Sequence, residues 1–423
     1  MQFAENKTVH LVGIGGVGMA ALAVLLKARG AVVSGCDIGS TPRTRWLAAQ
    51  GIPVLVGHDP AHLADVDEVI VTPAVAADNP ERRAAVCPRS RGEVLAALVS
   101  AAPDAVAVCG SHGKTTTATW IARLLLALGE SVEWAIGGET GDFPVAGRLP
   151  AEAKAPVLVV EADESDGTLA LYRARTLVVT NCEYDHPDHF PTPADYLACY
   201  ETAKRQAADV IASEALDVPD WPVLRTLAPH NRRNARTAVE VARRRGHDLA
   251  TILAALPAVV AQLPDRRFQP LADGVYTDYA HHPTEMACAV AMARRVCRGT
   301  LRVLFQPHRY SRTKALMGSF PAAFREADEV WICPTYAAFE KPVAGGDSTD
   351  LWRTVRAAGA STGAWQSGEG VRLAVSCAAA WAEASSAMRP GDVTLILGAG
   401  DIIALAPAIR AMRAADFDIL QLA

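Results

Sequence analysis

The chain has 423 residues, of which half are hydrophobic and about a fifth are charged, with a formal net charge of −5. This length and composition exclude a disordered chain and predict two or three globular domains. The mild negative charge argues against a nucleic-acid-binding protein, which would carry a clustered basic excess. No stretch approaches the roughly 20 apolar residues of a membrane span, and the start lacks the pattern of a signal peptide, so we expect a cytoplasmic protein without membrane insertion.

The first segment, residues 1–100, opens with "VHLVGIGGVGMAALAVLLKARGAVVSGCD", which predicts a strand, a glycine turn, a helix and a second strand. Glycines let the backbone approach a pyrophosphate at a helix N-terminus, and an acid after the second strand can bind a ribose hydroxyl. This loop fits NAD and equally fits the diphosphate of a nucleotide sugar, and it does not decide between them. The candidate residues are Gly13, Gly15, Gly16, Gly18 and Asp37.

The second segment, residues 101–263, begins with "AVAVCGSHGKTTTATW", a strand that runs into a second phosphate-binding loop and a helix. The strict P-loop pattern fails, because Val108 occupies its first glycine position, and a shorter G-x-x-G-K-T remains. Lys114 can reach the β- and γ-phosphate oxygens, and the Thr115 hydroxyl can bind Mg²⁺. We therefore expect a nucleotide triphosphate to bind at Gly110, Ser111, His112, Gly113, Lys114, Thr115 and Thr116.

Acidic residues follow two further apolar strands of the same segment. "VLVVEADESDG" places Glu161, Asp163 and Glu164 just after one strand, and "TLVVTNCEYDHPDHF" places His186 among acids after another. Ligands of doubly wound folds bind outside the carboxyl ends of the strands, and Mg²⁺ prefers oxygen ligands. The sequence therefore predicts a magnesium site beside the phosphate loop.

The third segment, residues 264–423, contains three strand ends, "VYTDYAHHP", "LRVLFQPHRYSRT" and "VTLILGAGD", after a boundary turn "LPDRRFQP". Strands and helices alternate along the whole chain, which predicts an α/β protein with parallel sheets. We expect three domains: a Rossmann-like N-terminal domain, a central P-loop-type ATPase domain with a mostly parallel sheet, and a Rossmann-like C-terminal domain.

Seven motifs in order, "GIGGVGM", "GSHGKTTT", "EADESDG", "DHPDHF", "HNRRNA", "DYAHHPTE" and "QPHRYSRT", resemble those of the Mur ligases of peptidoglycan synthesis. The resemblance implies an ATP- and Mg²⁺-dependent ligase that acts as a monomer or homodimer. A carboxylate, expected to be that of UDP-N-acetylmuramate, would take the γ-phosphoryl group of ATP and become an acyl phosphate. The amine of a small amino acid, expected to be L-alanine, would then attack it and displace phosphate.

The resemblance also implies residue roles. Lys114 would contact the ATP phosphates, and Thr115, Glu161 and His186 would hold metal ions. Asn231 would read adenine, and Arg267 and Asp278 would contribute to ATP binding, with Asp278 at the ribose. The incoming amino acid and the transferring phosphate would be held by His281, His308, Arg309 and Arg312. The first glycine loop would hold the UDP-sugar rather than NAD.

Only 43 residues separate His186 from His230, so a small subdomain of the central domain is expected to be missing. Lys204 is a candidate for the carbamylated lysine of some relatives, although an ordinary exposed helix position fits it better. Three alternatives stay open: a sibling ligase that attaches a murein peptide, a degenerate nucleotide-sensing relative, and a NAD-dependent dehydrogenase that would leave the second loop unexplained.

Overall fold

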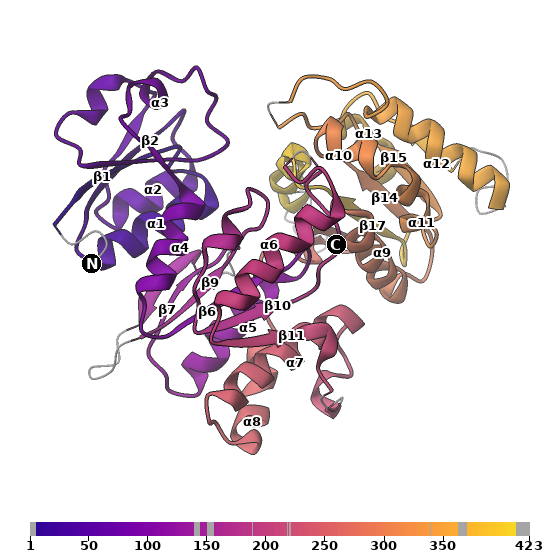
Figure 1. The fold of residues 1–423 in the computed structure, drawn as a ribbon. Coiled ribbons are helices and arrows are strands. Elements are labelled where there is room, and N and C mark those ends of the chain that lie inside the picture. The colour runs from indigo at the N-terminus through magenta and orange to yellow at the C-terminus, as the bar shows by residue number, and fades with distance from the viewer. Residues whose placement is uncertain are drawn as a thin grey trace, which may run out of the picture. The chain divides into compact units, whose positions relative to one another are not determined.

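The computed structural model describes residues 6–138, 144–149, 156–187, 189–217, 219, 221–338, 340–362 and 370–411. It divides into two compact units, Met1–Pro264 and Asp265–Ala423. The described strands form three sheets, two in the first unit and one in the second (Figure 1). Helices alternate with mostly parallel strands in each sheet, which confirms the predicted three-domain α/β class.

The first sheet is parallel and has the order β3-β2-β1-β4-β5. Its central strand β1 is buried on both faces from Val9 to Val12, as its apolar sequence requires. The chain leaves β1 for β2 on one side and later returns to β4 on the other, so the first glycine loop follows β1 at the switch point where doubly wound folds bind ligands. The strands are β1 (Thr8–Val12), β2 (Val32–Asp37), β3 (Val54–Val56), β4 (Glu68–Val71) and β5 (Arg89–Ser90). The helices are α1 (Val17–Ala28), α2 (Pro42–Ala49), η1 (Pro60–Leu63), α3 (Pro80–Ala84) and α4 (Arg91–Ala101).

The second sheet has the order β11-β10-β6-β9-β7-β8, with β8 antiparallel at one edge. Its strand β6 lies between β9 and β10, so the loops after these three strands share one edge of the sheet. The strands are β6 (Ala105–Cys109), β7 (Val132–Ala135), β8 (Ala146–Leu149), β9 (Val157–Glu161), β10 (Thr176–Val179) and β11 (Asp209–Ala212). The helices are α5 (Lys114–Ala127), η2 (Thr168–Leu171), α6 (Pro193–Gln206), η3 (Ser213–Ala215), η4 (Pro222–Leu224), α7 (Pro229–Arg244) and α8 (Leu249–Val260).

The third sheet has the order β12-β13-β17-β14-β15-β16, with β12 antiparallel at one edge. The strands are β12 (Gln269–Ala272), β13 (Val275–Asp278), β14 (Leu301–Phe305), β15 (Glu329–Ile332), β16 (Val371–Leu373) and β17 (Val393–Leu397). The helices are α9 (Pro283–Val296), α10 (Tyr310–Ala315), η5 (Met317–Ser319), α11 (Phe320–Ala323), α12 (Ser348–Thr362), α13 (Cys377–Ser386) and η6 (Asp401–Leu405).

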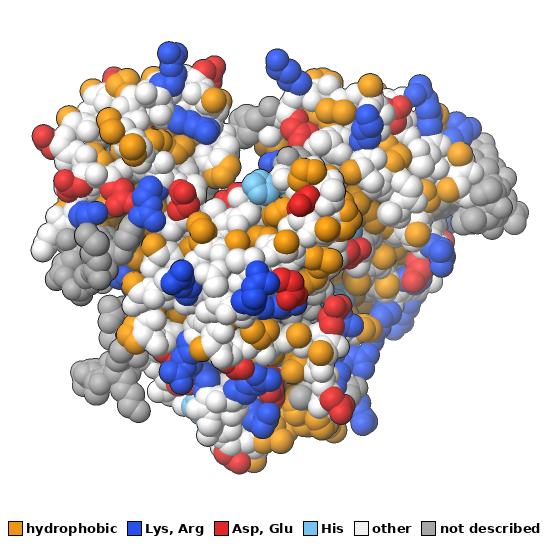
Figure 2. All heavy atoms as spheres, in the orientation of Figure 1, with side chains coloured by type: hydrophobic (Ala, Val, Ile, Leu, Met, Phe, Trp, Pro, Cys, Tyr) orange, Lys and Arg blue, Asp and Glu red, His pale blue; other side chains and the backbone are white. Residues whose placement is uncertain are grey.

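The surface charges and the helices of the described residues agree with the mild net charge and the globular composition of the sequence. On the face drawn in Figure 2, Lys and Arg side chains are interspersed with Asp and Glu rather than gathered into one basic patch. Among the described residues, no helix combines the length and the apolar character needed to cross a bilayer.

Candidate active site

The loop between β6 and α5 wraps tightly around the space in front of the helix N-terminus. Gly113 takes a left-handed conformation at φ 79°, and Gly110 has φ 130° with the Thr180 hydroxyl where a Cβ would lie. Both positions therefore need glycine. The Asn181 side chain accepts a hydrogen bond from the His112 N–H at 3.0 Å and donates to the His112 carbonyl at 2.9 Å, which fixes the backbone of the loop at His112.

Lys114 begins α5 and turns back over the loop. Its Nζ donates to the Gly110 carbonyl at 2.6 Å and to Glu164 Oε1 at 2.8 Å. Burial lowers the pKa of Lys114, but the carboxylates of Glu164 and Asp163 outweigh it, so the pKa lies above its ordinary value. The lysine is thus a fixed cation at the position where a phosphate chain would enter the loop.

Thr115 and Glu161 meet next to this lysine. The Thr115 hydroxyl donates to Glu161 Oε1 at 2.9 Å, and the Gly137 N–H donates to Glu161 Oε2 at 2.6 Å. Thr116 follows in the same helix turn and is buried. The pair Thr115–Glu161 brings together oxygen atoms from the first turn of α5 and from the end of β9.

His186 completes this cluster from the loop after β10. Its Nε2 lies 3.5 Å from Glu164 Oε1 and 3.7 Å from Asp185 Oδ2, and its backbone takes φ 56°. A non-glycine residue at positive φ is uncommon and marks a position that its surroundings hold in place. Glu164 thus joins Lys114 to His186.

The donor set fits a hard divalent cation. Thr115, Glu161 and Glu164 contribute oxygen atoms, and Glu164 Oε2 is buried without a hydrogen-bond partner. An unpartnered buried carboxylate oxygen is costly unless a cation or another donor completes it. Mg²⁺ held by these oxygens would neutralise the charge that gathers on a transferred phosphoryl group.

Asn231 lies on α7, one helical turn from a second asparagine that the sequence reasoning did not single out. Asn234 donates to Asn231 Oδ1 at 3.3 Å, and both side chains are buried. A Cβ added to Gly113 would meet Asn234 Oδ1 at 2.9 Å, so α7 packs directly behind the phosphate loop. The spacing "HNRRN" was visible in the sequence, but nothing in it assigned the second asparagine to the loop.

The first glycine loop is held by the acid that follows β2. Asp37 Oδ2 accepts from the Gly15 N–H at 2.8 Å, and Arg43 donates to the Gly15 carbonyl at 3.0 Å. A Cβ on Gly15 would lie 2.7 Å from this carboxylate. Gly13 has φ 81°, whereas Gly16 directly precedes α1 and Gly18 lies in its first turn, close to Arg91.

Arg91 is a second residue that sequence reasoning missed. It lies in the first turn of α4 and donates to Oδ2 of Asp163, in the acidic motif after β9, at 2.9 Å. Burial alone would raise the pKa of Asp163, but the charges of Arg91 and Lys114 lower it by more. The pKa therefore lies below its ordinary value, and the carboxyl stays ionised. Arg91 thus packs against Gly18 of the first domain and pairs with the acid Asp163 that follows β9.

The second unit gathers its predicted residues at the carboxyl edge of the third sheet. Asp278 ends β13, and its carboxylate accepts from the Phe268 N–H at 2.7 Å and the Ala280 N–H at 2.8 Å. Burial raises the pKa of Asp278. Arg267 lies over the Tyr279 ring, with its guanidinium carbon 5.2 Å from the centroid. Both oxygens of Asp278 thus already accept backbone hydrogen bonds, and a ribose would share them.

Two histidines and two arginines lie together after β13 and β14. The rings of His281 and His308 are 5.5 Å apart, and His308 stacks on Tyr336. Arg309 takes φ 66° at the start of α10, and Arg312 is buried in the same helix. Burial, with Arg312 and Arg309 adding to it, lowers the pKa of His308 to about 4.

Lys204, on α6, pairs with Glu201 at 2.8 Å, three residues earlier in the same helix. This pairing raises the pKa of Lys204.

Family models match both ends of the chain. The "Mur ligase family, catalytic domain" model matches residues 8–102, and the "Mur ligase, glutamate ligase domain" model matches residues 266–400. The UDP-N-acetylmuramate–L-alanine ligase of a Nocardioides strain is 36% identical, with 95% of each chain covered.

The chain belongs to the Mur ligase family.

Other similar Mur ligases include the UDP-N-acetylmuramate–L-alanine ligase of Thermosynechococcus vestitus, which is 33% identical with 97% of this chain and 96% of the relative covered. The crystal structure of the UDP-N-acetylmuramate–alanine ligase from Thermotoga maritima superposes with a TM-score of 0.74 at 25% identity, covering 97% of this chain and all of the other. A murein peptide ligase from Psychrobacter arcticus shares the fold, with a TM-score of 0.63 at 20% identity over 97% of this chain and 98% of the other.

Proposed function

We propose that this protein is an ATP-dependent ligase that joins L-alanine to the carboxylate of UDP-N-acetylmuramate in peptidoglycan precursor synthesis. The observation that carries the proposal is the cluster in which Lys114 and His186 both contact Glu164, next to the pair Thr115–Glu161. This cluster lies in a chain that aligns over nearly its full length with ligases named for that reaction.

In the proposed reaction, a carboxylate oxygen of the UDP-sugar attacks the γ-phosphorus of ATP, and ADP leaves. The alanine amine then attacks the carbonyl carbon of the acyl phosphate, loses a proton and expels orthophosphate. Lys114 would exchange its contact with Glu164 for the phosphate oxygens, where charge is redistributed in the transition state. Thr115, Glu161 and His186, together with the unpartnered Oε2 of Glu164, would hold Mg²⁺, which neutralises phosphate charge when bound.

The remaining roles follow the same proposal. Gly13, Gly15, Gly16 and Gly18 would admit the UDP diphosphate, with Asp37 fixing the loop. Asn231 would contact adenine, and Arg267 and Asp278 the ribose side of ATP. His281, His308, Arg309 and Arg312 would hold the amino-acid carboxylate and the acyl phosphate. Because both nucleotide substrates are cytoplasmic metabolites, a cytoplasmic location is part of the proposal, as are the domain limits 1–100, 101–263 and 264–423.

The test is phosphate release with UDP-N-acetylmuramate, ATP and Mg²⁺, with the amino acid varied among alanine, serine and glycine. We expect release that requires both the UDP-sugar and L-alanine, and a UDP-sugar product heavier by one alanine residue in mass spectrometry. Release with a murein tripeptide but not with alanine would identify a sibling ligase. Nucleotide binding without any release would identify a non-catalytic relative.

A further inference from the structure

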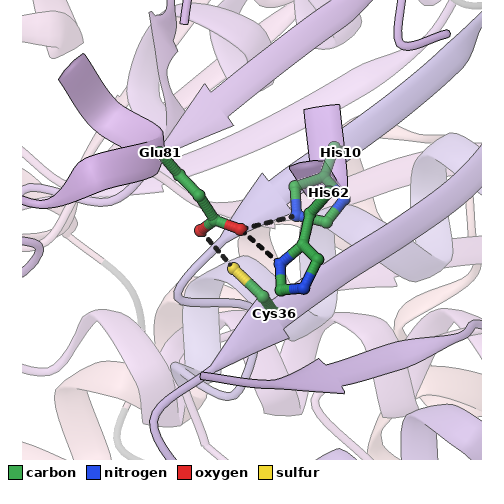
Figure 3. A group of neighbouring side chains, drawn as sticks. All are labelled: His10, Cys36, His62 and Glu81. Carbon is green, nitrogen blue, oxygen red and sulfur yellow. Dashed lines mark hydrogen bonds and ion pairs between the residues drawn. The ribbon is translucent and has the colours of Figure 1, made fainter. Parts of the chain in front are cut away.

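A group of metal-ligating side chains lies in the first domain, outside the proposed active site (Figure 3). His10 lies on β1, Cys36 on β2, His62 on η1 and Glu81 on α3, so four separate segments converge on one point. The side chains of His10 and Glu81 are 0% exposed, and Cys36 is equally buried. Burial of a carboxylate is costly unless it is paired with another group or binds a metal ion, and here two imidazoles and a thiol surround it.

Glu81 is the centre of this cluster. Its Oε1 lies 2.6 Å from His62 Nδ1 and 3.8 Å from His10 Nε2, while its Oε2 accepts from the Cys36 thiol at 2.7 Å. One ligand atom from each residue lies within 4.8 Å of all the others. Tetrahedral zinc with bonds of about 2.0–2.3 Å separates its ligand atoms by roughly 3.3–3.6 Å, so small side-chain shifts would make room for the ion.

His10 supplies the observation that points to a ligand. Its Nδ1 is 2.9 Å from the Ser34 hydroxyl, whereas its Nε2 is buried without a hydrogen-bond partner and faces Glu81. When Nδ1–H donates to Ser34, the lone pair of Nε2 points into the cluster, which is the arrangement of a metal-bound histidine with its outer partner.

We propose that His10, Cys36, His62 and Glu81 form a zinc site, independent of the magnesium expected beside the phosphate loop. One sulfur, two imidazole nitrogens and one carboxylate oxygen suit a borderline-soft ion such as Zn²⁺ and are unsuited to Mg²⁺, which prefers oxygen alone. Zinc binding would release the Cys36 thiol proton to solvent, and neutral His62 would carry its one proton on Nε2 when its Nδ1 binds the ion.

His58 supports the site from outside. Its Nδ1 lies 2.8 Å from Glu81 Oε2 and 3.3 Å from Cys36 Sγ. Its side chain and that of His62 are 15% and 19% exposed, so the cluster is partly open to solvent at these two histidines.

The site would act on the first glycine loop. The Cys36 carbonyl accepts hydrogen bonds from the N–H groups of Gly13 and Ile14 at 2.9 and 3.0 Å, and Asp37 holds Gly15. An ion bound to Cys36 would therefore fix the strand end that positions the loop, and would join η1 and α3 to the first sheet. We expect zinc to stabilise this domain rather than take part in chemistry.

The test uses the full-length protein, stripped with a chelator and titrated with Co²⁺ in excess Mg²⁺. We expect visible bands of tetrahedral cobalt and a near-ultraviolet thiolate-to-cobalt band, and about one tightly held zinc per chain by elemental analysis after zinc loading. Cys36→Ser should lose the thiolate band, and His62→Asn should weaken zinc binding at least tenfold. Cys87→Ser, at an exposed cysteine of the same domain, is the matched control and should behave as wild type.

Thermal unfolding provides the second measurement, because a ligand that binds only the folded state raises the melting temperature. Zinc should raise the melting temperature of wild type and of Cys87→Ser, but not that of Cys36→Ser. Should Cys36→Ser fail to fold, His62→Asn, at the partly exposed ligand, carries the comparison. Zinc at background in loaded wild type, or a thiolate band that survives in Cys36→Ser and shifts in Cys87→Ser, would overturn the proposal.

Discussion

Lys114 carries the clearest prediction at the scale of single residues. Lys114→Met should lower kcat by at least about 10²-fold, because a fixed charge on the transferred phosphoryl group is lost. The substitution also leaves Glu164 buried without its cation, which should lower the free energy of unfolding by up to about 3–5 kcal/mol. Phosphate release and chemical denaturation measure the two effects separately.

A double variant separates folding from chemistry at this position. Lys114→Met/Glu164→Gln removes the unpaired charge and should recover most of the lost stability, but no turnover. Lys204→Met, which breaks the pair with Glu201 on α6, is the control and should retain activity. Normal phosphate release by a folded Lys114→Met protein would place the phosphate loop outside the active site.

The lowered pKa of His308 predicts that the stability of the folded chain depends on pH. Its pKa is about 4 in the folded chain against 6.5 for the free side chain, so the unfolded state binds the proton more tightly. This contribution is complete above pH 6.5 and is lost as the pH falls toward 4, with a maximum of about 3 kcal/mol. Denaturation at several pH values should show a flatter slope over this range in His308→Asn than in wild type. An unchanged slope would mean that His308 is protonated in the folded chain as readily as in water.

Which of these residues could be read from sequence follows from how they are positioned. Glu161 ends an apolar strand, and Lys114 and His186 lie in the segments that follow two others. Parallel strands bring such ends to one edge of the sheet. Asn234 and Arg91 lie on helices whose contact with the loop depends on packing, and no local pattern encodes that. The cluster around Glu81 was missed for the same reason, since its members are spread from residue 10 to residue 81 and share no motif.

At the scale of elements, a single added methyl group, in Gly15→Ala, tests whether the first glycine loop binds the UDP-sugar. Gly15→Ala would place a Cβ 2.7 Å from Asp37 Oδ2 and should weaken UDP-sugar binding at least about tenfold, because the carboxylate must move and release the loop. Gly39→Ala, where a Cβ meets nothing within 4 Å, is the matched control. Calorimetric titration with the UDP-sugar measures the effect.

The same titration with NAD distinguishes the two ligands that the loop left open. We expect no heat from NAD in either protein. Tight NAD binding by wild type without a response to the UDP-sugar would restore the dehydrogenase interpretation of this domain.

The elements themselves were largely predictable. The alternation of apolar strands with Ala- and Leu-rich helices predicted parallel sheets, and the structure has them, with β8 and β12 as antiparallel edges. These two strands pair with β7 and β13 respectively. No periodicity in the sequence reports the direction in which an edge strand pairs, because the direction depends on the length and course of its connection.

At the scale of the whole molecule, the proposed chemistry needs both compact units. His281, His308 and Arg309 belong to the second unit, whereas Lys114 and Glu161 belong to the first. Reacting atoms must come within about 3–3.5 Å, and water must be kept from the acyl phosphate. We therefore expect ATP and the UDP-sugar together to close the units about a hinge near residues 264–267, with a smaller radius of gyration in solution scattering.

Arg309→Ala should slow amide formation far more than it weakens UDP-sugar binding, because its proposed partner is the anionic intermediate or the amino-acid carboxylate. Arg353→Ala, at an exposed arginine on α12, is the control and should be neutral. An unchanged radius of gyration together with a normal kcat for Arg309→Ala would leave the third domain with some other role.

The contact between Lys114 and Glu164 has a consequence for the end of each turnover. The carboxylate is tethered beside the lysine, so it competes with any phosphate at a high effective concentration. ATP can displace Glu164 from Lys114 because it also binds through its metal ion and many other contacts. Orthophosphate, once released from the acyl phosphate, has few other contacts and binds more weakly. Glu164 would thus displace the product orthophosphate from Lys114 at the end of each turnover. The enzyme should therefore resist inhibition by high phosphate concentrations that inhibit a Glu164→Gln variant.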